Sequence, residues 1–473
     1  MTAPDSPLLQ QAAELRQRVG GDYHDKLMEA IFTDASRIAD ESVTRDGARA
    51  RLGCDQRLDR ALTHPVYGFV VMGLMLLAVF WITIAGSNIP SSLLSELLLV
   101  HVYGALHAGA AALSAPAWLS GLLIDGIYLG TAWVVAVMLP PMMIFFPLFT
   151  LLEDFGYLPR VAFNLDRLFA KAGAHGKQSL SMMMGYGCNA AGVISTRIID
   201  SPRERLIAIL TNNFSICNGR WPTLILMGTI FIGASAPPAL ASAAAALSVV
   251  ATALLGIAFT LLVSAFLSRT WLKGEASVYS LELPPYRPPQ IVRTLYTSII
   301  DRTLIVLSRA ILMAAPAGAV IWLISNVTIG DASIAAHLVS LLNPLGLLIG
   351  LNGVILVAYI VAIPANEIII PTILMLTLTL GRNIAGAQAG VMLELDDAEV
   401  YTVLTQVGGW TLLTAINLML FSLLHNPCST TLLTIYGETK SLKWTAVAAL
   451  LPLALGFSVT FATATAARLL GLV

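Results

Sequence analysis

The sequence carries little charge. Only 12% of its 473 residues are Asp, Glu, Lys or Arg, about half the share that is typical of a soluble domain. The net charge of −1 gives no reason to expect nucleic acid or another strongly charged partner. Hydrophobic residues make up 57% of the chain, in long runs rather than short alternating strands. This pattern predicts an all-α polytopic membrane protein built as a helical bundle.

Cysteine is also scarce, and its placement fits no disulfide framework. The four cysteines are Cys54, Cys188, Cys217 and Cys428. Cys54 belongs to a polar N-terminal stretch, whereas the other three fall within expected membrane spans. We expect these three thiols to be reduced.

Composition along the chain predicts four parts. They are a cytoplasmic helical arm (1–64), a first transmembrane half (65–270), a cytoplasmic linker with an amphipathic segment (271–302), and a second transmembrane half (303–473). We expect about nine to eleven spans in total. The range reflects half-helices, which can be counted singly or in pairs.

Lysine and arginine predict the orientation. The loops at 160–177, 197–205 and 269–302 are basic, whereas 85–118 and 326–345 contain no Lys or Arg. Because positive residues of short loops stay on the cytoplasmic side, we expect a cytoplasmic N-terminus.

Four stretches inside the apolar regions indicate broken helices, each with a helix breaker beside a thiol or a carboxylate. They are Gly185–Gly192, Asn212–Pro222, Ile363–Glu367 and His425–Thr431. Glycine weakens a helix by about 1 kcal/mol relative to alanine. Inside a bilayer, non-helical backbone survives only where it is buried in protein or lines a cavity. Two breaks fall in each half, as in transporters that are built from internal repeats around a midplane site.

The candidate metal-ligating residues are Cys188, Asn189, Cys217, Asn366, Glu367 and Cys428, with Glu153, Asn218 and His425 as weaker candidates. Each has a structural alternative, since a buried cysteine often acts as a small hydrophobe and His425 or Glu153 can stand at a span's edge. A carboxylate at the centre of a span costs about 2.5–3.5 kcal/mol, which favours a functional role for Glu367. Thiolates suit softer metals and oxygens suit harder ones. The mixed set therefore predicts Fe²⁺ or a neighbouring ion, with Zn²⁺ and Mn²⁺ left open.

An ordered set of motifs resembles the membrane domain of the bacterial ferrous iron transport protein B family. The motifs are Leu151–Arg160, Asp166–Leu168, Gly185–Asn189, Thr196–Arg197, Arg205–Arg220, Glu282–Arg287, Pro427–Cys428 and Lys443–Trp444. They span about residues 55–470. The resemblance implies two gate-type repeats, loosely similar to nucleoside-transporter halves. It maps the family's cysteines onto Cys188, Cys217 and Cys428, and its second-gate glutamate onto Glu367.

The sequence departs from this family at several positions around the breaks, and it lacks the phosphate-binding loop of the family's GTP-binding domain. Ala190 and Ala191 follow the Gly-Cys-Asn motif, where the family usually has valine and proline. No stretch matches the phosphate-binding pattern G-x-x-x-x-G-K-[ST], because the only Gly-Lys pair, Gly176-Lys177, is followed by Gln178. We therefore expect no enzymatic activity, and we expect any GTPase to be a separate chain.

The resemblance implies a multi-pass protein of the bacterial inner membrane that imports Fe²⁺, with the ion as substrate and no permanent cofactor. The bilayer, a separate GTPase subunit or small accessory protein, and a second copy of the chain are the partners to consider. Three alternatives remain open at this stage. They are a carrier of Mn²⁺ or another divalent metal, a proton- or sodium-coupled carrier of a small solute such as a nucleoside, and a membrane protein that transports nothing itself and serves only as a scaffold for a GTPase.

Overall fold

The computed structural model describes residues 23–42, 58–64, 66–173, 176–237, 240–274, 286, 290–330, 332–381 and 397–471. Cys54 lies outside these ranges. The arm and first half contain α2 (Tyr23–Ser42), α4 (Tyr67–Ser95), η1 (Glu96–Val102), α5 (Tyr103–Ala112), α6 (Ala117–Ser120), η2 (Gly121–Tyr128), α7 (Leu129–Asp154), α8 (Tyr157–Lys171), α9 (Gln178–Gly187), α10 (Asn189–Ser195), η3 (Thr196–Ile198), α11 (Pro202–Thr211), η4 (Asn212–Phe214), α12 (Trp221–Met227), η5 (Gly228–Gly233) and α13 (Ala241–Arg269).

The remaining elements form the second half. They are α14 (Ile291–Thr297), η6 (Ser298–Leu304), α15 (Ile305–Asn326), β1 (Thr328–Ile329), β2 (Ala332–Ser333), α16 (Ile334–Leu348), α17 (Gly353–Val361), η7 (Asn366–Ile368), α18 (Ile369–Gly381), α19 (Asp397–Thr402), η8 (Val403–Val407), α20 (Leu412–Leu424), α21 (Ser429–Thr439) and α22 (Leu442–Leu469). The two short strands pair as one antiparallel hairpin.

The fold is that of a multi-pass membrane protein. Six helices in the described ranges are long and apolar enough to cross a membrane, and a seventh span results if the bent pair α16–α17 counts as one. The sequence predicted nine to eleven spans, which is more than the described ranges contain, and the difference lies in short helices that pair into hairpins or halves. Helix α13 exposes leucines such as Leu247, Leu254 and Leu262, a surface that suits lipid.

Two helical hairpins place loops in the interior of the helical domain. Helices α9 and α10 pack against each other, and the Nζ of Lys177 before α9 lies 2.9 Å from the Oδ2 of Asp200 beyond α10. The two ends of the hairpin thus lie close together, and Cys188 stands at its tip. Helices α17 and α18 also pack together, and residues 362–368 form their tip.

Two further helices are interrupted halfway. Helices α11 and α12 are separated by residues 212–220, and α20 and α21 by residues 425–428. Each repeat therefore supplies one hairpin tip and one interrupted helix. The sequence predicted two breaks in each half, but not that the two breaks differ in kind.

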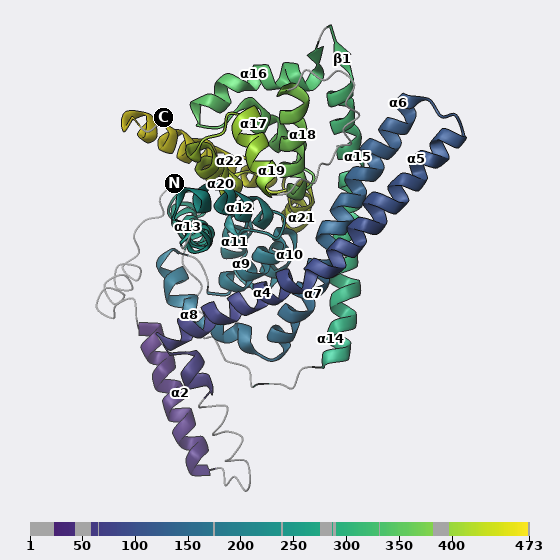
Figure 1. The fold of residues 1–473 in the computed structure, drawn as a ribbon. Coiled ribbons are helices and arrows are strands. Elements are labelled where there is room, and N and C mark those ends of the chain that lie inside the picture. Colours follow the sequence, from purple (N-terminus) through teal and green to yellow (C-terminus); the bar gives the residue numbers. More distant parts are fainter. Residues whose placement is uncertain are drawn as a thin grey trace, which may run out of the picture.

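The arm, α8 and the linker meet at a buried arginine. The Nε of Arg160, whose side chain is 2% exposed, donates to the Oδ1 of Asp59 at 2.9 Å, and the guanidinium lies 4.0 Å from the ring centre of Tyr286. Burial raises the pKa of Tyr286 to about 12, so its hydroxyl remains protonated and donates to Asp59 at 2.7 Å. Figure 1 shows α2, α8 and α14 towards one end of the molecule, with α6, β1 and α16 towards the other.

Candidate functional site

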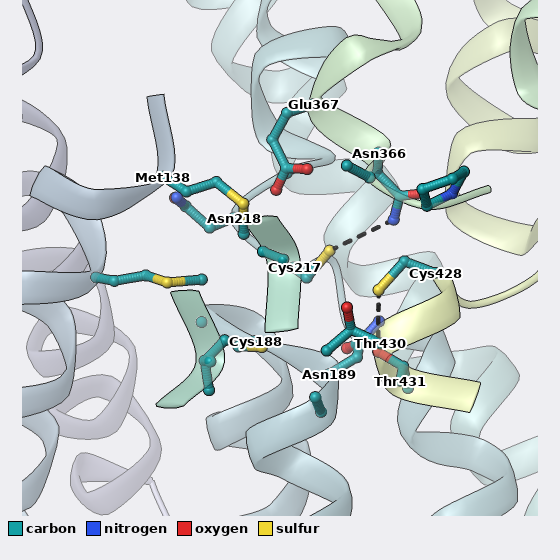
Figure 2. Close-up of a pocket in the computed structure, with 18 residues that line it drawn as sticks. Met138, Cys188, Asn189, Cys217, Asn218, Asn366, Glu367, Cys428, Thr430 and Thr431 are labelled. Carbon is teal, nitrogen blue, oxygen red and sulfur yellow. Dashed lines mark hydrogen bonds between the residues drawn. The ribbon is translucent and has the colours of Figure 1, made fainter. Parts of the chain in front are cut away.

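The four breaks surround one cavity. Its volume is about 40 Å³, against about 10–15 Å³ for a single enclosed water, so it has room for an ion and little more. The lining includes all six principal candidates and Asn218: Cys188, Asn189, Cys217, Asn218, Asn366, Glu367 and Cys428. Figure 2 shows Glu367 and Cys188 towards opposite ends of this cavity, with Cys217 and Cys428 between them.

The two hairpin tips have matching backbones. Cys188 has φ −150° and ψ 122°, and Ala365 has φ −151° and ψ 117°. In each repeat an asparagine follows this extended residue and begins a short helix, Asn189 in α10 and Asn366 in η7. Ala365 is thus the counterpart of Cys188, and the two asparagines are counterparts of each other.

In each repeat, a backbone hydrogen bond joins the hairpin tip to the interrupted helix. The donor is the residue directly after the cysteine of that helix. The backbone N–H of Asn218 donates to the carbonyl of Gly187 at 3.1 Å. The backbone N–H of Ser429 likewise donates to the carbonyl of Ile363 at 2.9 Å. Cys217 and Cys428 therefore occupy equivalent positions, and both are free thiols.

Polar groups accompany each of these thiols. The Nδ2 position of Asn366 lies 3.9 Å from the Sγ of Cys217, so the tip of the second hairpin contacts the interrupted helix of the first repeat. The Sγ of Cys428 lies 3.2 Å from the Oγ1 of Thr431, one turn into α21. Thr431 and Thr430 both line the cavity, where their hydroxyls add oxygen to the wall.

Glu367 packs against the backbone of the opposite repeat. A Cβ built on Gly219 would lie 2.2 Å from the Oε1 of Glu367, so only glycine leaves room for the carboxylate. Within the described part of the chain, no basic side chain forms an ion pair with Glu367. An unpaired carboxylate at the cavity is suited to a cation.

Arg220 joins the two repeats beside the cavity. Its side chain is fully buried, and its Nη1 donates to the carbonyls of Asn213 at 2.8 Å and Leu423 at 3.2 Å. Its Nη2 donates to the Oδ1 of Asn213 at 2.9 Å and to the carbonyl of His425 at 3.4 Å. The guanidinium thus satisfies backbone carbonyls that the interruption of α20 leaves without helical partners.

Two weaker candidates lie outside the cavity lining. Glu153 is exposed on the last turn of α7. His425 is 2% exposed and stands behind Asn366, with its Nε2 3.1 Å from the Oδ1 position of that residue.

Sequence reasoning missed two methionines of α7 that line the cavity, Met138 and Met142. Figure 2 draws Met138 among the side chains that line the cavity. The sequence signal that could have identified this part of α7 is the pair Pro140 and Pro141, which lies between the two methionines inside the helix. A thioether is a soft ligand, so these residues extend the soft side of the cavity.

The arrangement suits passage of an ion better than permanent storage. No three His, Cys, Asp or Glu side chains among the described residues stand close enough together to hold an ion by themselves. The thiols, amides and carboxylate are instead distributed around the cavity. Incomplete coordination is expected of a site that must also release its ion.

Two known families match the chain. The nucleoside-recognition Gate family matches residues 135–231 and 307–442, one segment in each half. The family of the ferrous iron transport protein B C terminus matches residues 249–301, between those two segments. No solved structure matches the chain.

Curated relatives of the chain are Fe(2+) transporters named FeoB, in agreement with the second of these two families. The Fe(2+) transporter FeoB of Staphylococcus aureus (strain MSSA476) is 30% identical over 421 residues, which are 86% of this chain and 58% of the relative. The FeoB of Synechocystis is 29% identical over 85% of this chain and 62% of its own length. A fusion of Fe(2+) transport protein A with FeoB in Porphyromonas gingivalis is 28% identical over 49% of this chain and 26% of its length. The chain therefore spans about three fifths of the length of the first two relatives.

Proposed function

Because this chain belongs to the ferrous iron transport protein B family over its membrane region, we propose that it carries Fe²⁺ across the bacterial inner membrane. The ion is the transported substrate, and it passes through the cavity between the four helix breaks. The observation that best supports this route is that three thiols and an unpaired carboxylate, which are far apart in sequence, line one cavity.

The size of the cavity favours an ion over an organic solute. Pockets for small organic ligands usually hold about 300–1,000 Å³, whereas this cavity has a volume of about 40 Å³. A nucleoside would need the two repeats to move well apart. We therefore disfavour the solute-carrier alternative, although the Gate family is described by nucleoside recognition.

The donor set favours a divalent ion of intermediate character. Cys188, Cys217 and Cys428 provide soft sulfur, and Glu367 with the amides of Asn189 and Asn366 provides oxygen. Thiolate alone would favour Cu(I) or Zn²⁺, and oxygen alone would favour Mg²⁺ or Mn²⁺. Fe²⁺ accepts both, and Mn²⁺ remains the second candidate on the strength of the oxygen ligands.

We also propose that the basic end of the domain faces the cytoplasm, as lysine and arginine in short loops predict. A small accessory protein is the partner that the fusion in Porphyromonas gingivalis supports. The 473 residues contain no phosphate-binding loop. Any coupling to GTP would therefore involve sequence beyond these residues, on this chain or another.

Uptake into liposomes tests the proposal. The purified chain is reconstituted, and Fe²⁺ entry is followed anaerobically with a metal-quenched dye in the lumen. We expect uptake by the wild type and a loss of about tenfold or more when Cys188, Cys217 and Cys428 are all changed to Ser, because serine keeps the size but removes the soft ligand. Glu367→Gln should also lower uptake, because it removes the one carboxylate that the described residues contribute to the cavity lining.

The matched control is Cys54→Ser, the same exchange in the N-terminal arm, which should leave uptake unchanged. Uptake that persists in the triple serine variant would show that the thiols only pack, and would shift the assignment towards Mn²⁺ on oxygen ligands. No uptake of any divalent ion by the well-folded wild type would reject transport by this chain alone.

A further inference from the structure

His425 occupies a buried position behind the cavity. It follows α20 directly, and its ring packs against Tyr359 and Phe421, with ring centroids 4.9 and 6.4 Å away. Both ring nitrogens have partners. Nδ1 lies 2.8 Å from the carbonyl oxygen of Ser422, and Nε2 lies 3.1 Å from the end of the Asn366 amide.

The partners of the ring determine where its proton lies. A carbonyl oxygen can only accept, so Nδ1 must carry the hydrogen that it donates to Ser422. In a neutral imidazole Nε2 is then an acceptor. A doubly protonated ring would place a second buried positive charge next to Arg220, which already binds the His425 carbonyl at 3.4 Å, and burying such an unpaired charge is costly. The atom of Asn366 that faces Nε2 is therefore the donor, the amide nitrogen.

This assignment turns the carbonyl oxygen of Asn366 towards Cys217. The amide atom on that edge lies 3.9 Å from the Sγ of Cys217. A divalent ion with a metal–sulfur bond of about 2.3 Å and a metal–oxygen bond of about 2.1 Å separates these two ligands by about 3.6–3.8 Å at ordinary angles. The observed separation is thus close to that of two ligands sharing one ion.

Asn189, the counterpart of Asn366, also has its amide nitrogen held by hydrogen-bond acceptors, but the acceptors are different groups. With its nitrogen placed to donate, the Asn189 amide bonds the carbonyls of Gly185 at 3.0 Å and Ser215 at 3.2 Å. Its carbonyl oxygen then lies on the opposite edge. The first repeat orients its asparagine with two backbone carbonyls, and the second repeat does so with a histidine.

We propose that His425 is a positioning residue that fixes the Asn366 amide with its oxygen towards Cys217, so that thiol and amide oxygen act together on the ion. The inference rests on the proposed function, since it assumes that metal occupies the cavity. Without His425 the amide can rotate, and its nitrogen, which cannot bind a metal, can face the thiol instead.

The test measures metal affinity directly. The purified full chain is titrated anaerobically with Co²⁺, whose thiolate absorption reports sulfur ligation. His425→Phe keeps the ring contacts with Tyr359 and Phe421 but removes both nitrogens, and we expect it to weaken Co²⁺ binding by about tenfold or more. His425→Gln, which can accept from Asn366 and donate to Ser422, should largely restore it. His337→Phe is the matched control, because His337 is exposed and its Nδ1 also contacts a backbone carbonyl, that of Ser333 at 3.0 Å.

A second variant separates positioning from other roles. Asn366→Asp has an oxygen on both edges, so its orientation no longer matters, and adding H425F to N366D should cause no further loss. An equal loss in both backgrounds would overturn the proposal, because His425 would then act on the ion or the fold without Asn366. Unchanged affinity in H425F would overturn it as well and leave the proposed transport intact. Absence of Co²⁺ and Fe²⁺ binding in the wild type would reject the proposed function itself.

Discussion

Gly185 and Gly192 make room for a polar side chain as well as weakening a helix. A Cβ on either glycine would lie within 2.7 Å of the Oδ1 of Asn212. Asn212 in turn donates from Nδ2 to the carbonyl of Asn189 at 2.9 Å, across the tip of the first hairpin. A larger residue at either glycine would push Asn212 away and leave that carbonyl without its partner.

Gly219 allows a sharper test, because the three atoms nearest to a Cβ built there all belong to the flexible side chain of Glu367. Gly219→Ala should displace the Glu367 carboxylate, which lies 2.2 Å from the new Cβ, without changing any charge. We expect Fe²⁺ uptake to fall by about tenfold or more, since small misplacements of a coordinating group are costly. The melting temperature should stay close to that of the wild type.

Gly437→Ala is the matched control, because a Cβ there meets nothing within 4 Å and alanine favours the helix. It should keep full uptake. If G219A also keeps full uptake, the position of the Glu367 carboxylate does not matter to transport.

The sequence indicated residues that line the cavity, but it did not indicate which residues of the two repeats are equivalent to each other. Glycine, proline and asparagine beside a thiol mark a break by local chemistry alone, and all six principal candidates reach the lining. The equivalence of Cys188 and Ala365 could not be read in this way, because Gly-Cys-Asn and Pro-Ala-Asn share little beyond the asparagine. Only the matching backbone angles reveal it. The sequence also did not show that Arg220 is buried, or that two of its carbonyl partners, those of Leu423 and His425, come from the other repeat.

Helices α10 and α21 connect the cavity to the basic end of the domain. They begin after Cys188 and Cys428, and they pack against each other. At their far ends Glu438 joins them, with Oε1 2.6 Å from the Nη2 of Arg197 and Oε2 2.6 Å from the Nη2 of Arg205. This ion-pair cluster ties the two repeats together between the cavity and the proposed cytoplasm.

Glu438→Gln should loosen this connection. Removing the charge leaves two arginines without their carboxylate, so the ends of α10 and α21 should separate more often. We expect a small membrane-permeant maleimide to modify Cys188 and Cys428 several-fold faster than in the wild type, as quantified by mass spectrometry of the labelled peptides.

Asp200→Asn is the control for this experiment. It also removes a carboxylate from an ion pair, but Lys177 and Asp200 belong to the same hairpin. Its labelling rate should match the wild type. Equal rates in all three proteins would show that the Glu438 cluster does not limit access to the cavity.

The hairpins also explain why hydrophobic runs alone gave a larger number of spans. An apolar run of ten residues is compatible with half of a span, with a hairpin arm, or with a short span. What decides between these is the direction of the next helix, and that depends on how the two helices pack together, as α9 packs against α10. The long helices α4, α7, α13, α15 and α22 needed no such information.

The whole molecule has one basic end, and several contacts gather at it. Thr294 Oγ1 lies 2.5 Å from Asp154 Oδ2, which brings the start of α14 to the end of α7. Arg203 Nε donates to the carbonyl of Leu272 at 2.5 Å, which brings α11 to the end of α13. The α5–α6 turn and the β1–β2 hairpin lie towards the opposite end in Figure 1, and the sections 85–118 and 326–345 that contain them have no Lys or Arg.

Cysteine labelling in intact cells tests the orientation that this asymmetry predicts. Single cysteines are placed at exposed positions of the full chain, with Cys54 changed to Ser: Leu113→Cys and Ile329→Cys at one end, Lys273→Cys and Val292→Cys at the other. An impermeant maleimide should label the first pair on intact cells and the second only after permeabilisation, because positive loops stay in the cytoplasm. The parent chain without these additions measures any background from the three cavity thiols. Labelling of Lys273→Cys on intact cells would show that the orientation is the reverse of the proposed one. The hairpin that carries Cys188 would then face the outside of the cell, and the hairpin that carries Glu367 would face the cytoplasm.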